Sequence, residues 1–395
     1  MLDKICTYYP YHIGIIGGGE LGKMMTIAAK QLGFNVIILD PTPDCPAAQV
    51  ADKQIIASFT DRESITSLAK SSQVVTYEFE YIDSQTLIDL VQAGHKIYPN
   101  PSTLQVIQNK LFQKEALVKG GIPVTFFSPV KDRGDILALA KNWSYPLILK
   151  SCIGGYDGRG SYVIKGPSDI DKALEMFKGI ELMVETFVPF VCEVSMIVVR
   201  SKSDGVRIYP LAENKHVDNI LQHSITPARV SDSVVQRARE IAAQTIEVFQ
   251  GIGVFCIEMF VTLEGNILVN QVVPRPHNSG HYTIEACVTS QFEQHIRAIC
   301  DLPLGDTRLL NPAIMVNLLG TPGEQGRAVV EGCATALKIP GVNLHIYGKK
   351  ETWPNRKMGH VTIIAPALKE AMFYGKQVAR ILKVRALKEG ENDGK

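Results

Sequence analysis

A glycine-rich segment between a short apolar strand and a helix limits the fold of this chain more than any other feature. The sequence predicts a strand over residues 12–16, then the segment Gly17-Gly18-Gly19-Glu20-Leu21-Gly22, a helix to about residue 32, and a second apolar strand over residues 35–39. Strands and helices continue to alternate as far as residue 98. This alternation predicts a parallel sheet with helices on both faces.

The spacing of Gly17, Gly19 and Gly22 matches the G-x-G-x-x-G pattern of dinucleotide sites, and Asp40 ends the second strand as such a site requires. Glycines here let a phosphate approach backbone N–H groups at the positive end of a helix, so any phosphorylated ligand fits. A tight turn with a structural role is the alternative. A dehydrogenase would also need a nicotinamide pocket, for which the later sequence offers no residues.

The composition excludes several classes of protein. With 395 residues the chain is two to three times a usual domain of ~150 residues, so we expect two or three modules. Its 41 basic and 40 acidic residues leave a net charge of +1, which argues against nucleic acid as a partner. No apolar run approaches the ~20 residues of a membrane span and the N-terminus lacks a secretion signal, so we expect no membrane association and a cytoplasmic location. The eight scattered cysteines lack a CxxC pair and predict free thiols, not a zinc site.

A second glycine-rich loop follows Lys150, which is expected at the end of a strand over residues 145–149. The loop has four glycines in the seven residues 154–160, and the next strand is expected to begin at Ser161. Main-chain N–H groups in such a loop, together with Arg159, can cover a polyphosphate. The segment therefore favours a phosphate lid over a simple hairpin connection.

Glu258 interrupts an otherwise apolar strand over residues 253–261. A buried carboxylate is costly unless a cation or metal ion meets it. If Glu264-Gly265 is a two-residue hairpin turn, Gln271 lies opposite Glu258, with Cβ atoms ~5 Å apart, close enough to share a magnesium ion. The alternative is an exposed glutamate on an edge strand.

A proline-containing motif follows at residues 274–281. Pro274 and Pro276 hold their neighbours in extended geometry, so Arg275, His277 and Asn278 are displayed on a stiff backbone. Such rigid display of polar groups predicts a binding or catalytic site.

A basic loop lies between two late strands and contains Lys349, Lys350, Arg356 and Lys357. Arg and Lys make charge-assisted hydrogen bonds to the oxygens of a phosphomonoester. A solvated basic loop explains the same residues equally well.

Four segments together carry a resemblance to a known family: Tyr77-Glu78-Phe79-Glu80 and residues 154–160, 274–281 and 356–360. From residue 14 to about residue 385 the chain resembles the ATP-grasp superfamily and, within it, the family of N5-carboxyaminoimidazole ribonucleotide synthetases, ATP-dependent carboxylases of purine biosynthesis. The resemblance implies a mixed α/β and α+β fold of ATP-grasp architecture. It divides the chain into a doubly wound pre-ATP-grasp domain (1–100), an ATP-grasp domain (101–305), a small β-rich C-terminal domain (306–385) and a charged tail (386–395).

The resemblance also implies an ATP and magnesium site. It assigns the ATP phosphates to Lys110, Lys150 and a lid made of Gly155, Tyr156, Asp157, Gly158, Arg159, Gly160 and Ser161. The adenine would lie against Glu185, Thr186, Phe187 and Val188, with Glu193 on the ribose hydroxyls and His216 nearby. Asn270 and Gln271 would also contact the nucleotide, and Glu258 with Gln271 would bind Mg²⁺.

The second substrate implied by the resemblance is aminoimidazole ribotide. It would be held by Glu78, Tyr156, Asp157, Arg275, His277 and Asn278, with Gly19, Glu20 and Leu21 from the glycine loop and with its phosphate on Lys349, Arg356 and Lys357. In the reaction of the family, ATP phosphorylates bicarbonate to carboxyphosphate, and the CO2 released from it carboxylates the exocyclic amine of the ribotide. The family resemblance further implies a homodimer, whose product a separate mutase would process.

This chain departs from the family pattern at three positions. Gln271 replaces a usual glutamate, so a neutral amide stands where a magnesium carboxylate is expected; hard divalent ions favour anionic oxygen, which predicts weaker magnesium binding and lower turnover. Glu20 replaces a usual glutamine, and Trp353 replaces a usual arginine. Two alternatives follow: a ligase similar to formate-dependent glycinamide ribonucleotide formyltransferase, or a ligand-binding family member that has lost turnover.

Overall fold

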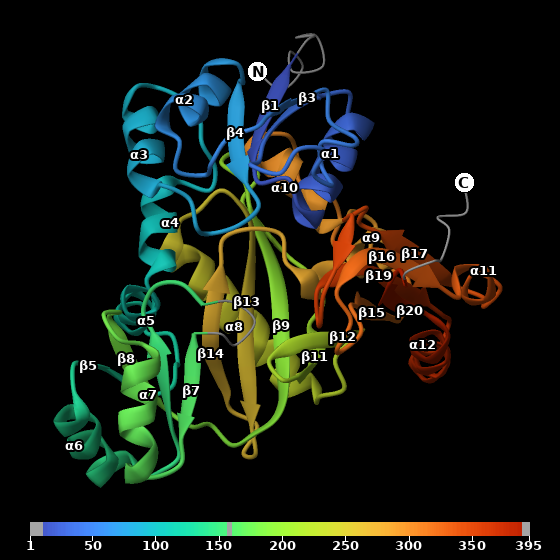
Figure 1. The fold of residues 1–395 in the computed structure, drawn as a ribbon. Coiled ribbons are helices and arrows are strands. Elements are labelled where there is room, and N and C mark those ends of the chain that lie inside the picture. Colours follow the sequence, from blue (N-terminus) through green and yellow to red (C-terminus); the bar gives the residue numbers. More distant parts are fainter. Residues whose placement is uncertain (1–10, 156–159, 389–395) are drawn as a thin grey trace.

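The computed structural model describes residues 11–155 and 160–388. The N-terminal part contains a four-stranded parallel sheet in the order β3-β2-β1-β4, flanked by helices (Figure 1). Its elements are β1 (His12–Ile16), α1 (Glu20–Gln31), β2 (Asn35–Leu39), β3 (Lys53–Ile55), α2 (Arg62–Lys70), β4 (Val74–Tyr77) and α3 (Ser84–Gln92). The predicted parallel sheet is confirmed. The strand expected at residues 96–98 is reduced to one bridge, between Ile97 and Val75.

Two helices, α4 (Pro101–Gln108) and α5 (Lys110–Lys119), replace the single helix that the sequence predicted over residues 102–119. The break is at Asn109, whose backbone is extended and whose side chain accepts hydrogen bonds from Leu111 N at 2.9 Å and Phe112 N at 3.2 Å. An asparagine N-cap satisfies N–H groups that have no partner within the helix. The break places Lys110 at the start of α5, where its N–H donates to Cys152 O at 2.7 Å.

A small antiparallel sheet in the order β5-β8-β6-β7 follows. Its elements are β5 (Phe127–Val130), α6 (Arg133–Trp143), β6 (Leu147–Ser151), β7 (Ser161–Ile164), η2 (Pro167–Asp169), α7 (Ile170–Met176) and β8 (Leu182–Thr186). Lys150, which was expected to end a strand, lies inside β6 opposite Ser161, the first residue of β7 as predicted. The glycine-rich loop thus joins two hydrogen-bonded strands.

The largest sheet has nine strands and runs from the middle of the chain into its C-terminal part (Figure 1). Its order is β14-β13-β9-β11-β12-β15-β19-β17, with β10 beside β9. These strands are β9 (Phe190–Arg200), β10 (Val206–Ile208), β11 (Ala212–Val217), β12 (Ile220–Thr226), β13 (Gly253–Thr262), β14 (Ile267–Val273), β15 (Ala313–Leu319), β17 (Val342–Ile346) and β19 (Lys357–Ile364). Because β12 pairs with β15, one continuous sheet joins the middle and the C-terminal parts of the chain.

Helices cover this sheet and a three-stranded sheet completes the fold. The helices of this part are α8 (Asp232–Phe249), η3 (Asn278–Gly280), α9 (Thr283–Ala286), α10 (Gln291–Ile299), α11 (Cys333–Ala336) and α12 (Leu368–Ile381). The small sheet has the order β18-β16-β20 and contains β18 (Glu351–Thr352), β16 (Gly326–Glu331) and β20 (Lys383–Ala386). Helix α8 packs Ile241 into the core that also contains Phe255 of β13.

Helix α10 connects the N-terminal sheet to the nine-stranded sheet. Its residues Phe292 and Ile296 share a core with Ile13 of β1. Its fully buried His295 accepts a hydrogen bond from Val254 N at Nδ1 (3.1 Å) and lies 2.7 Å from Thr76 Oγ1 through Nε2. Burial lowers the pKa of His295 to about 3, so the ring is neutral and its Nε2–H donates to Thr76. This contact positions the end of β4 against the large sheet.

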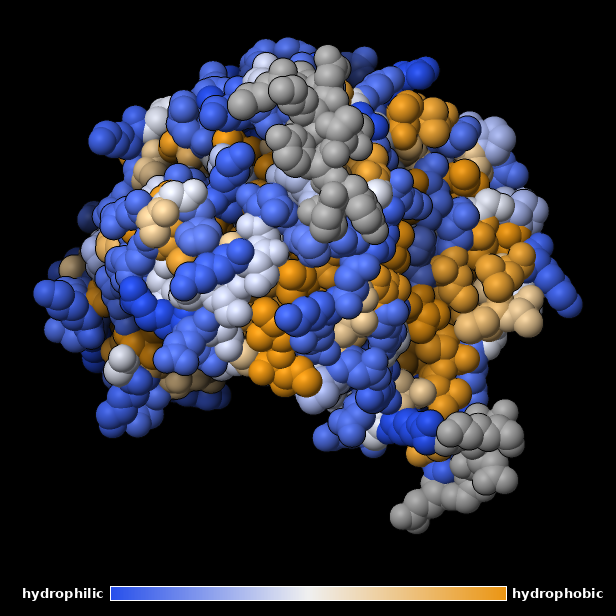
Figure 2. Space-filling model, turned by 90° about the horizontal axis from the view of Figure 1, so that it is seen from above, coloured by the Kyte–Doolittle hydropathy of each residue, from blue (hydrophilic) through white to orange (hydrophobic). Residues whose placement is uncertain are grey.

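The surface and the cysteines agree with the composition. Figure 2 shows the end of the molecule that carries the N-terminal sheet. Hydrophilic residues predominate on this face, and hydrophobic residues gather mainly on the side of the C-terminal part. The seven cysteines in the described ranges are free, as predicted, and five of them are buried; Cys6 lies outside these ranges. None of the helices within residues 11–155 and 160–388 has the length and apolar character needed to cross a lipid bilayer.

Candidate active site

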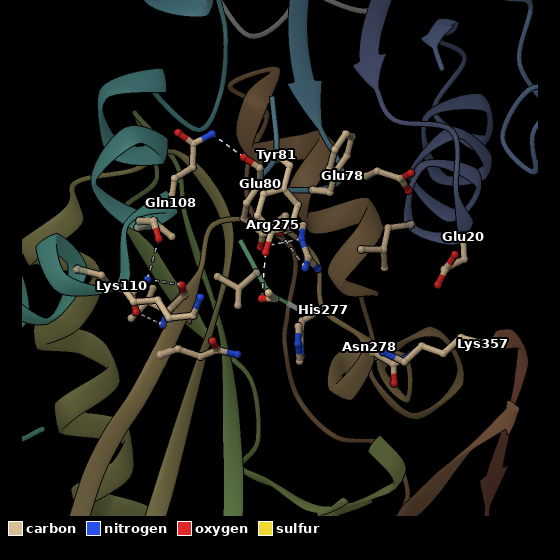
Figure 3. A pocket seen from close by; sticks show the side chains of 18 of the residues that line it. Glu20, Glu78, Glu80, Tyr81, Gln108, Lys110, Arg275, His277, Asn278 and Lys357 are labelled. Carbon is tan, nitrogen blue, oxygen red and sulfur yellow. Dashed lines mark hydrogen bonds and ion pairs between the residues drawn. The ribbon is translucent and has the colours of Figure 1, made fainter. Parts of the chain in front are cut away.

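A cavity of about 340 Å³ opens where four of the predicted motifs approach one another (Figure 3). Lys110 lies on one side of it, Glu20 and Lys357 lie on the other, and Arg275 and His277 lie between them. Concave sites of ~300 to 1,000 Å³ are typical of small-molecule binding. The motifs at residues 17–22, 77–80, 274–281 and 356–360 thus contribute to one site.

A second cavity of about 570 Å³ lies between the glycine loop and the basic loop at residues 348–356. It shares Glu20, Glu78 and Phe79 with the first cavity, so the two are adjacent. Asp40 and Gly19 lie on one wall of the second cavity. Together the two cavities offer room for more than one small molecule.

Three N–H groups of the glycine loop donate to carboxylates of the chain itself in this structure. Gly18 N donates to Asp40 Oδ2 at 2.8 Å, and the N–H groups of Gly19 and Gly22 both donate to the carboxylate of Glu78. Burial, and then the charge of Glu20, raise the pKa of Glu78 to about 7, against the opposing effect of these two donors. The positive end of α1 therefore binds a carboxylate of the chain itself, beside both cavities.

Arg275 is held in place by a second acidic residue of the same motif. Its guanidinium contacts both carboxylate oxygens of Glu80, at 3.0 Å from Nε to Oε1 and 3.2 Å from Nη2 to Oε2 (Figure 3). Such a bidentate pair fixes the plane of the guanidinium. Arg275 lines the first cavity, as the proline-containing motif predicted.

His277 is a neutral donor that faces Glu258. Ser279 N donates to His277 Nδ1 at 3.3 Å, so the proton of the ring is on Nε2, which lies 3.5 Å from Glu258 Oε1. Burial, and then the charge of Arg275, hold the pKa of His277 well below its usual range. The ring therefore offers one fixed N–H at the edge of the cavity.

Glu258 and Gln271 form a directly opposed pair, as predicted, but through a different turn. The hairpin between β13 and β14 has a three-residue loop, in which Thr262 N donates to Asn266 O at 2.9 Å and Gly265 has a φ of +79°. A left-handed glycine is typical of such loops. The loop shifts the register by one residue, and a bulge at Asn270 restores it before Gln271. The expected two-residue turn is therefore wrong, whereas the expected pairing is confirmed.

The Gln271 amide donates from Nε2 to Glu258 Oε2. Burial raises the pKa of Glu258. In the part of the chain that the structure describes, no group of three or more His, Cys, Asp or Glu side chains is arranged to hold a metal ion by itself. The donors here are one carboxylate and neutral amides, which fits an ion that also takes oxygens from substrate phosphates, as Mg²⁺ commonly does.

Three charged residues of the predicted ATP region form a buried cluster. Glu185 accepts from Lys150 Nζ at 2.9 Å and lies 3.4 Å from Lys114 Nζ. Burial lowers the pKa of Lys114 to about 8, and the two lysines outweigh burial and hold the pKa of Glu185 below its usual range. The carboxylate of Glu185 is thus occupied, and its backbone lies in β8 between Phe127 of β5 and Ile148 of β6. Beyond it, Thr186 and Val188 are half-buried and Phe187 is exposed. Lys114 was missed by the sequence analysis, although a lysine on the apolar face of a helix is a signal for a buried partner.

Lys110 lies beside this cluster and against the glycine-rich loop. Its Nζ donates to Gly154 O at 2.6 Å and to Ser151 O at 3.2 Å, and burial and Lys150 lower its pKa. The loop is closed at its base, where Ser151 N donates to Gly160 O at 2.9 Å. The structure thus brings together Lys110, Lys150, Gly155, Gly160 and Ser161. The predicted lid residues Tyr156, Asp157, Gly158 and Arg159 lie outside the described residues.

Glu193 of β9 and His216 of β11, which the family resemblance placed near the ribose, are in contact with each other. Burial opposes a charge on His216, but the carboxylates of Glu193 and Glu258 outweigh it and raise its pKa. Glu258 of β13 pairs with Ser195 of β9, which is two residues from Glu193. Because side chains two residues apart on a strand point to the same face, Glu193 and Glu258 lie on one face of the sheet. This face carries the predicted ribose and metal residues together.

The basic loop gathers its cations around both cavities. Lys349 Nζ lies 2.7 Å from Glu20 Oε2 and donates to Lys357 O at 2.8 Å. Lys349 outweighs burial and lowers the pKa of Glu20. Arg356 stacks on the ring of Trp353 at 3.6 Å, and both line the second cavity. Trp353 thus stands where the family pattern has an arginine, and its ring supports the guanidinium of Arg356.

Two further positions differ from expectation. The side chain of Asn278 exchanges hydrogen bonds with Asn317 of β15 at 2.6 and 3.0 Å, so this amide joins η3 to β15 in addition to lining the cavity. Tyr81, which the sequence analysis did not select, donates from its hydroxyl to Gly155 O at 3.0 Å. It links the N-terminal part to the glycine-rich loop.

Comparisons with known proteins identify the family of the chain. Three domain families match: the ribonucleotide synthetase preATP-grasp domain at residues 11–108, the ATP-grasp domain at 115–292, and the phosphoribosylaminoimidazole carboxylase C-terminal domain at 313–373. The N5-carboxyaminoimidazole ribonucleotide synthase of Bacillus subtilis is 45% identical over 364 residues, which are 92% of this chain and 94% of that protein. The phosphoribosylaminoimidazole carboxylase of Saccharomyces cerevisiae is 42% identical over 91% of this chain, which spans only 64% of the yeast protein.

Solved structures are similar over almost the whole chain. The crystal structure of N5-carboxyaminoimidazole ribonucleotide synthetase from Thermotoga maritima has a TM-score of 0.88 and 49% identity, over 95% of this chain and 100% of that one. The enzyme from Aspergillus clavatus, solved with ADP and 5-aminoimidazole ribonucleotide, has a TM-score of 0.87 and 35% identity, over 94% and 98% of the two chains. The chain belongs to the family of N5-carboxyaminoimidazole ribonucleotide synthetases, which are ATP-grasp ligases of purine biosynthesis.

Proposed function

We propose that this chain uses ATP and bicarbonate to convert 5-aminoimidazole ribonucleotide to N5-carboxyaminoimidazole ribonucleotide. One observation carries the proposal: Lys110, Arg275, His277 and Lys357 line a single cavity, which Gln271 also lines. A bicarbonate oxygen attacks the γ-phosphorus of ATP, which gives carboxyphosphate and ADP. Carboxyphosphate then releases CO2 and phosphate, and the exocyclic amine of the ribotide adds to CO2 and loses a proton.

The residues at the four-stranded antiparallel sheet β5-β8-β6-β7 would hold the triphosphate. Lys110 and Lys150 supply positive charge beside the glycine-rich loop, and Glu185 holds Lys150 at 2.9 Å in one orientation. Phosphoryl transfer depends on positioning and on neutralising charge more than on covalent help from the protein. Closure of the loop over the nucleotide would exclude water from carboxyphosphate.

Glu258 and Gln271 are the residues proposed to hold Mg²⁺ together with ATP oxygens. When bound, the ion would neutralise part of the charge of the phosphates. Only one of these two side chains is anionic, so binding of the ion would depend strongly on the nucleotide. His277 Nε2, 3.5 Å from Glu258, keeps that carboxylate oriented.

The ribotide would lie between Glu78 and the basic loop. Arg275, oriented by Glu80, supplies a fixed positive charge beside the reacting carboxyl group, and His277 supplies a neutral donor. Glu78, with a pKa of about 7, can bind or release a proton near neutral pH, which suits a group beside an amine that loses one. Lys349, Arg356 and Lys357 would receive the phosphate. A homodimer, a separate mutase and a cytoplasmic location remain predictions.

The experiment is a measurement of ATP-dependent phosphate release with two substrate pairs. Aminoimidazole ribotide plus bicarbonate is expected to give release and carbamate product, and Lys150→Met is expected to abolish both. Lys172→Met removes an exposed lysine of α7 and is the matched control, with no expected effect. Release only with formate plus glycinamide ribotide, which Glu20-Leu21 favours, would overturn the proposal in favour of a formyltransferase. Tight ATP binding without product at saturating magnesium would favour a non-catalytic member.

A further inference from the structure

His281 has a buried polar atom that the mechanism above does not use. The residue follows η3, is fully buried and lines the first cavity. Its Nε2 has no hydrogen-bond partner in the described part of the chain. An unpaired buried polar group is costly, and such groups in folded proteins call for an explanation.

The neighbouring Gln291 determines which ring nitrogen of His281 carries the proton. Gln291 Oε1 accepts from His277 N at 3.0 Å, so its amide nitrogen must face the other way. That nitrogen donates to His277 O at 2.7 Å and lies 3.4 Å from His281 Nδ1. Because an amide N–H points at Nδ1, this atom acts as an acceptor and the proton of the ring is on Nε2. The atom without a partner is therefore an N–H donor.

The ring of His281 is held by its aromatic neighbours. Phe292 lies 5.6 Å away and His360 lies 4.6 Å away between ring centroids. The charged and titratable groups that interact electrostatically with His281 are Glu20, Arg275, His277, His345, Lys357 and His360. Burial is the main cause that lowers the pKa of His281 to about 3, so the ring is neutral at physiological pH. A fixed neutral donor among two cations suits an oxygen atom of an anionic ligand.

We propose that His281 is a further ribotide-binding residue, whose Nε2–H donates to an oxygen of the ribose phosphate part of the substrate. This inference rests on the proposed function, which assigns the ATP phosphates to Lys110 and Lys150 on the opposite side of the cavity. Glu20, which acts electrostatically on His281, is already paired with Lys349 at 2.7 Å. The ligand oxygen completes the hydrogen bonding of the site.

The test compares three variants by titration calorimetry, with aminoimidazole ribotide and ATP as separate ligands. His281→Phe keeps an aromatic ring but lacks the donor, and it is expected to weaken ribotide binding about tenfold while ATP binding changes less than about twofold. His281→Gln can place an amide N–H near the position of Nε2 and is expected to retain most of the affinity. His360→Phe is the matched control, because His360 is equally buried, also has an Nε2 without a partner in the described residues, and does not line this cavity.

Each outcome decides between the two proposals. If wild type binds the ribotide and His281→Phe binds it equally well, this inference fails and the proposed function stands. It also fails if His281→Phe and His360→Phe weaken both ligands alike and unfold at similarly lowered temperatures, because the role is then structural. If wild type does not bind the ribotide, both proposals fail. Should His281→Phe not fold, His281→Met replaces it as the variant without a donor.

Discussion

Replacing Gln271 with glutamate should destabilise the metal-free protein, and magnesium should offset most of this loss. In the present chain Gln271 Nε2 donates to the carboxylate of Glu258, directly across the strand pair. Gln271→Glu removes this hydrogen bond to a charged group, which costs about 1.5–3 kcal/mol. It also places two carboxylates together, whose repulsion is about 4 kcal/mol at 4 Å and an effective dielectric constant of 20.

The pair can relieve part of this repulsion by sharing a proton. The expected net loss for the metal-free protein is therefore about 2–4 kcal/mol near pH 7.5. The loss should be smaller at pH 5, because the raised pKa of the pair lets it hold a proton there. With magnesium the second anionic oxygen becomes a ligand, and we expect the ion to bind ten to one hundred times more tightly, which corresponds to about 1.4–2.8 kcal/mol.

The assay is thermal unfolding in EDTA and in MgCl2, combined with the magnesium dependence of phosphate release. Gln271→Met is the matched control: it loses the hydrogen bond without adding charge, so it should be destabilised in EDTA and gain nothing from magnesium. Gln271→Glu should require less magnesium for half-maximal rate and turn over faster. If it is as stable as the parent in EDTA, or if its magnesium requirement and rate are unchanged, the reasoning about this pair is wrong.

Three other predictions concern charged groups around the site. Glu20→Gln releases Lys349 from its 2.7 Å ion pair and should lower the KM for the ribotide several-fold without changing that for ATP; steady-state kinetics that show a higher ribotide KM would contradict this. Lys114→Met leaves buried Glu185 with one lysine and should cost about 3 kcal/mol in urea unfolding, part of which a second change, Glu185→Gln, should restore. His295 has a pKa of about 3 in the folded protein and about 6.5 in the unfolded chain. Below pH 6.5 the unfolded chain therefore binds a proton at His295 that the folded protein does not bind, and the free energy of unfolding decreases. From pH 7 to pH 5 this amounts to about 2 kcal/mol, and His295→Gln should remove that part of the pH dependence of unfolding.

Local features of the sequence were sufficient to predict the elements that carry the site. The bounds of β1 and β2, His12–Ile16 and Asn35–Leu39, agree with the predicted ranges, because continuous apolar runs between turns are a local signal. The proline-containing motif around Arg275 was predicted for a similar reason, since proline restricts its own neighbours. The split between α4 and α5 was missed, although the N-cap at Asn109 that causes it is itself local.

The partners of the charged groups were decided by tertiary structure alone. The sequence could not show that Glu78 accepts hydrogen bonds from the N–H groups of Gly19 and Gly22. Glu78 is 59 and 56 positions away from these glycines, and it meets them only when β4 pairs with β1. It placed Gln271 opposite Glu258 through a two-residue turn, whereas a three-residue loop and a compensating bulge produce the same pair. Backbone propensity acts over a few residues, but register and ion pairing depend on how whole sheets pack. The composition and spacing of this chain therefore determined which chemistry is present, and the packing of its three larger sheets decided which groups face one another.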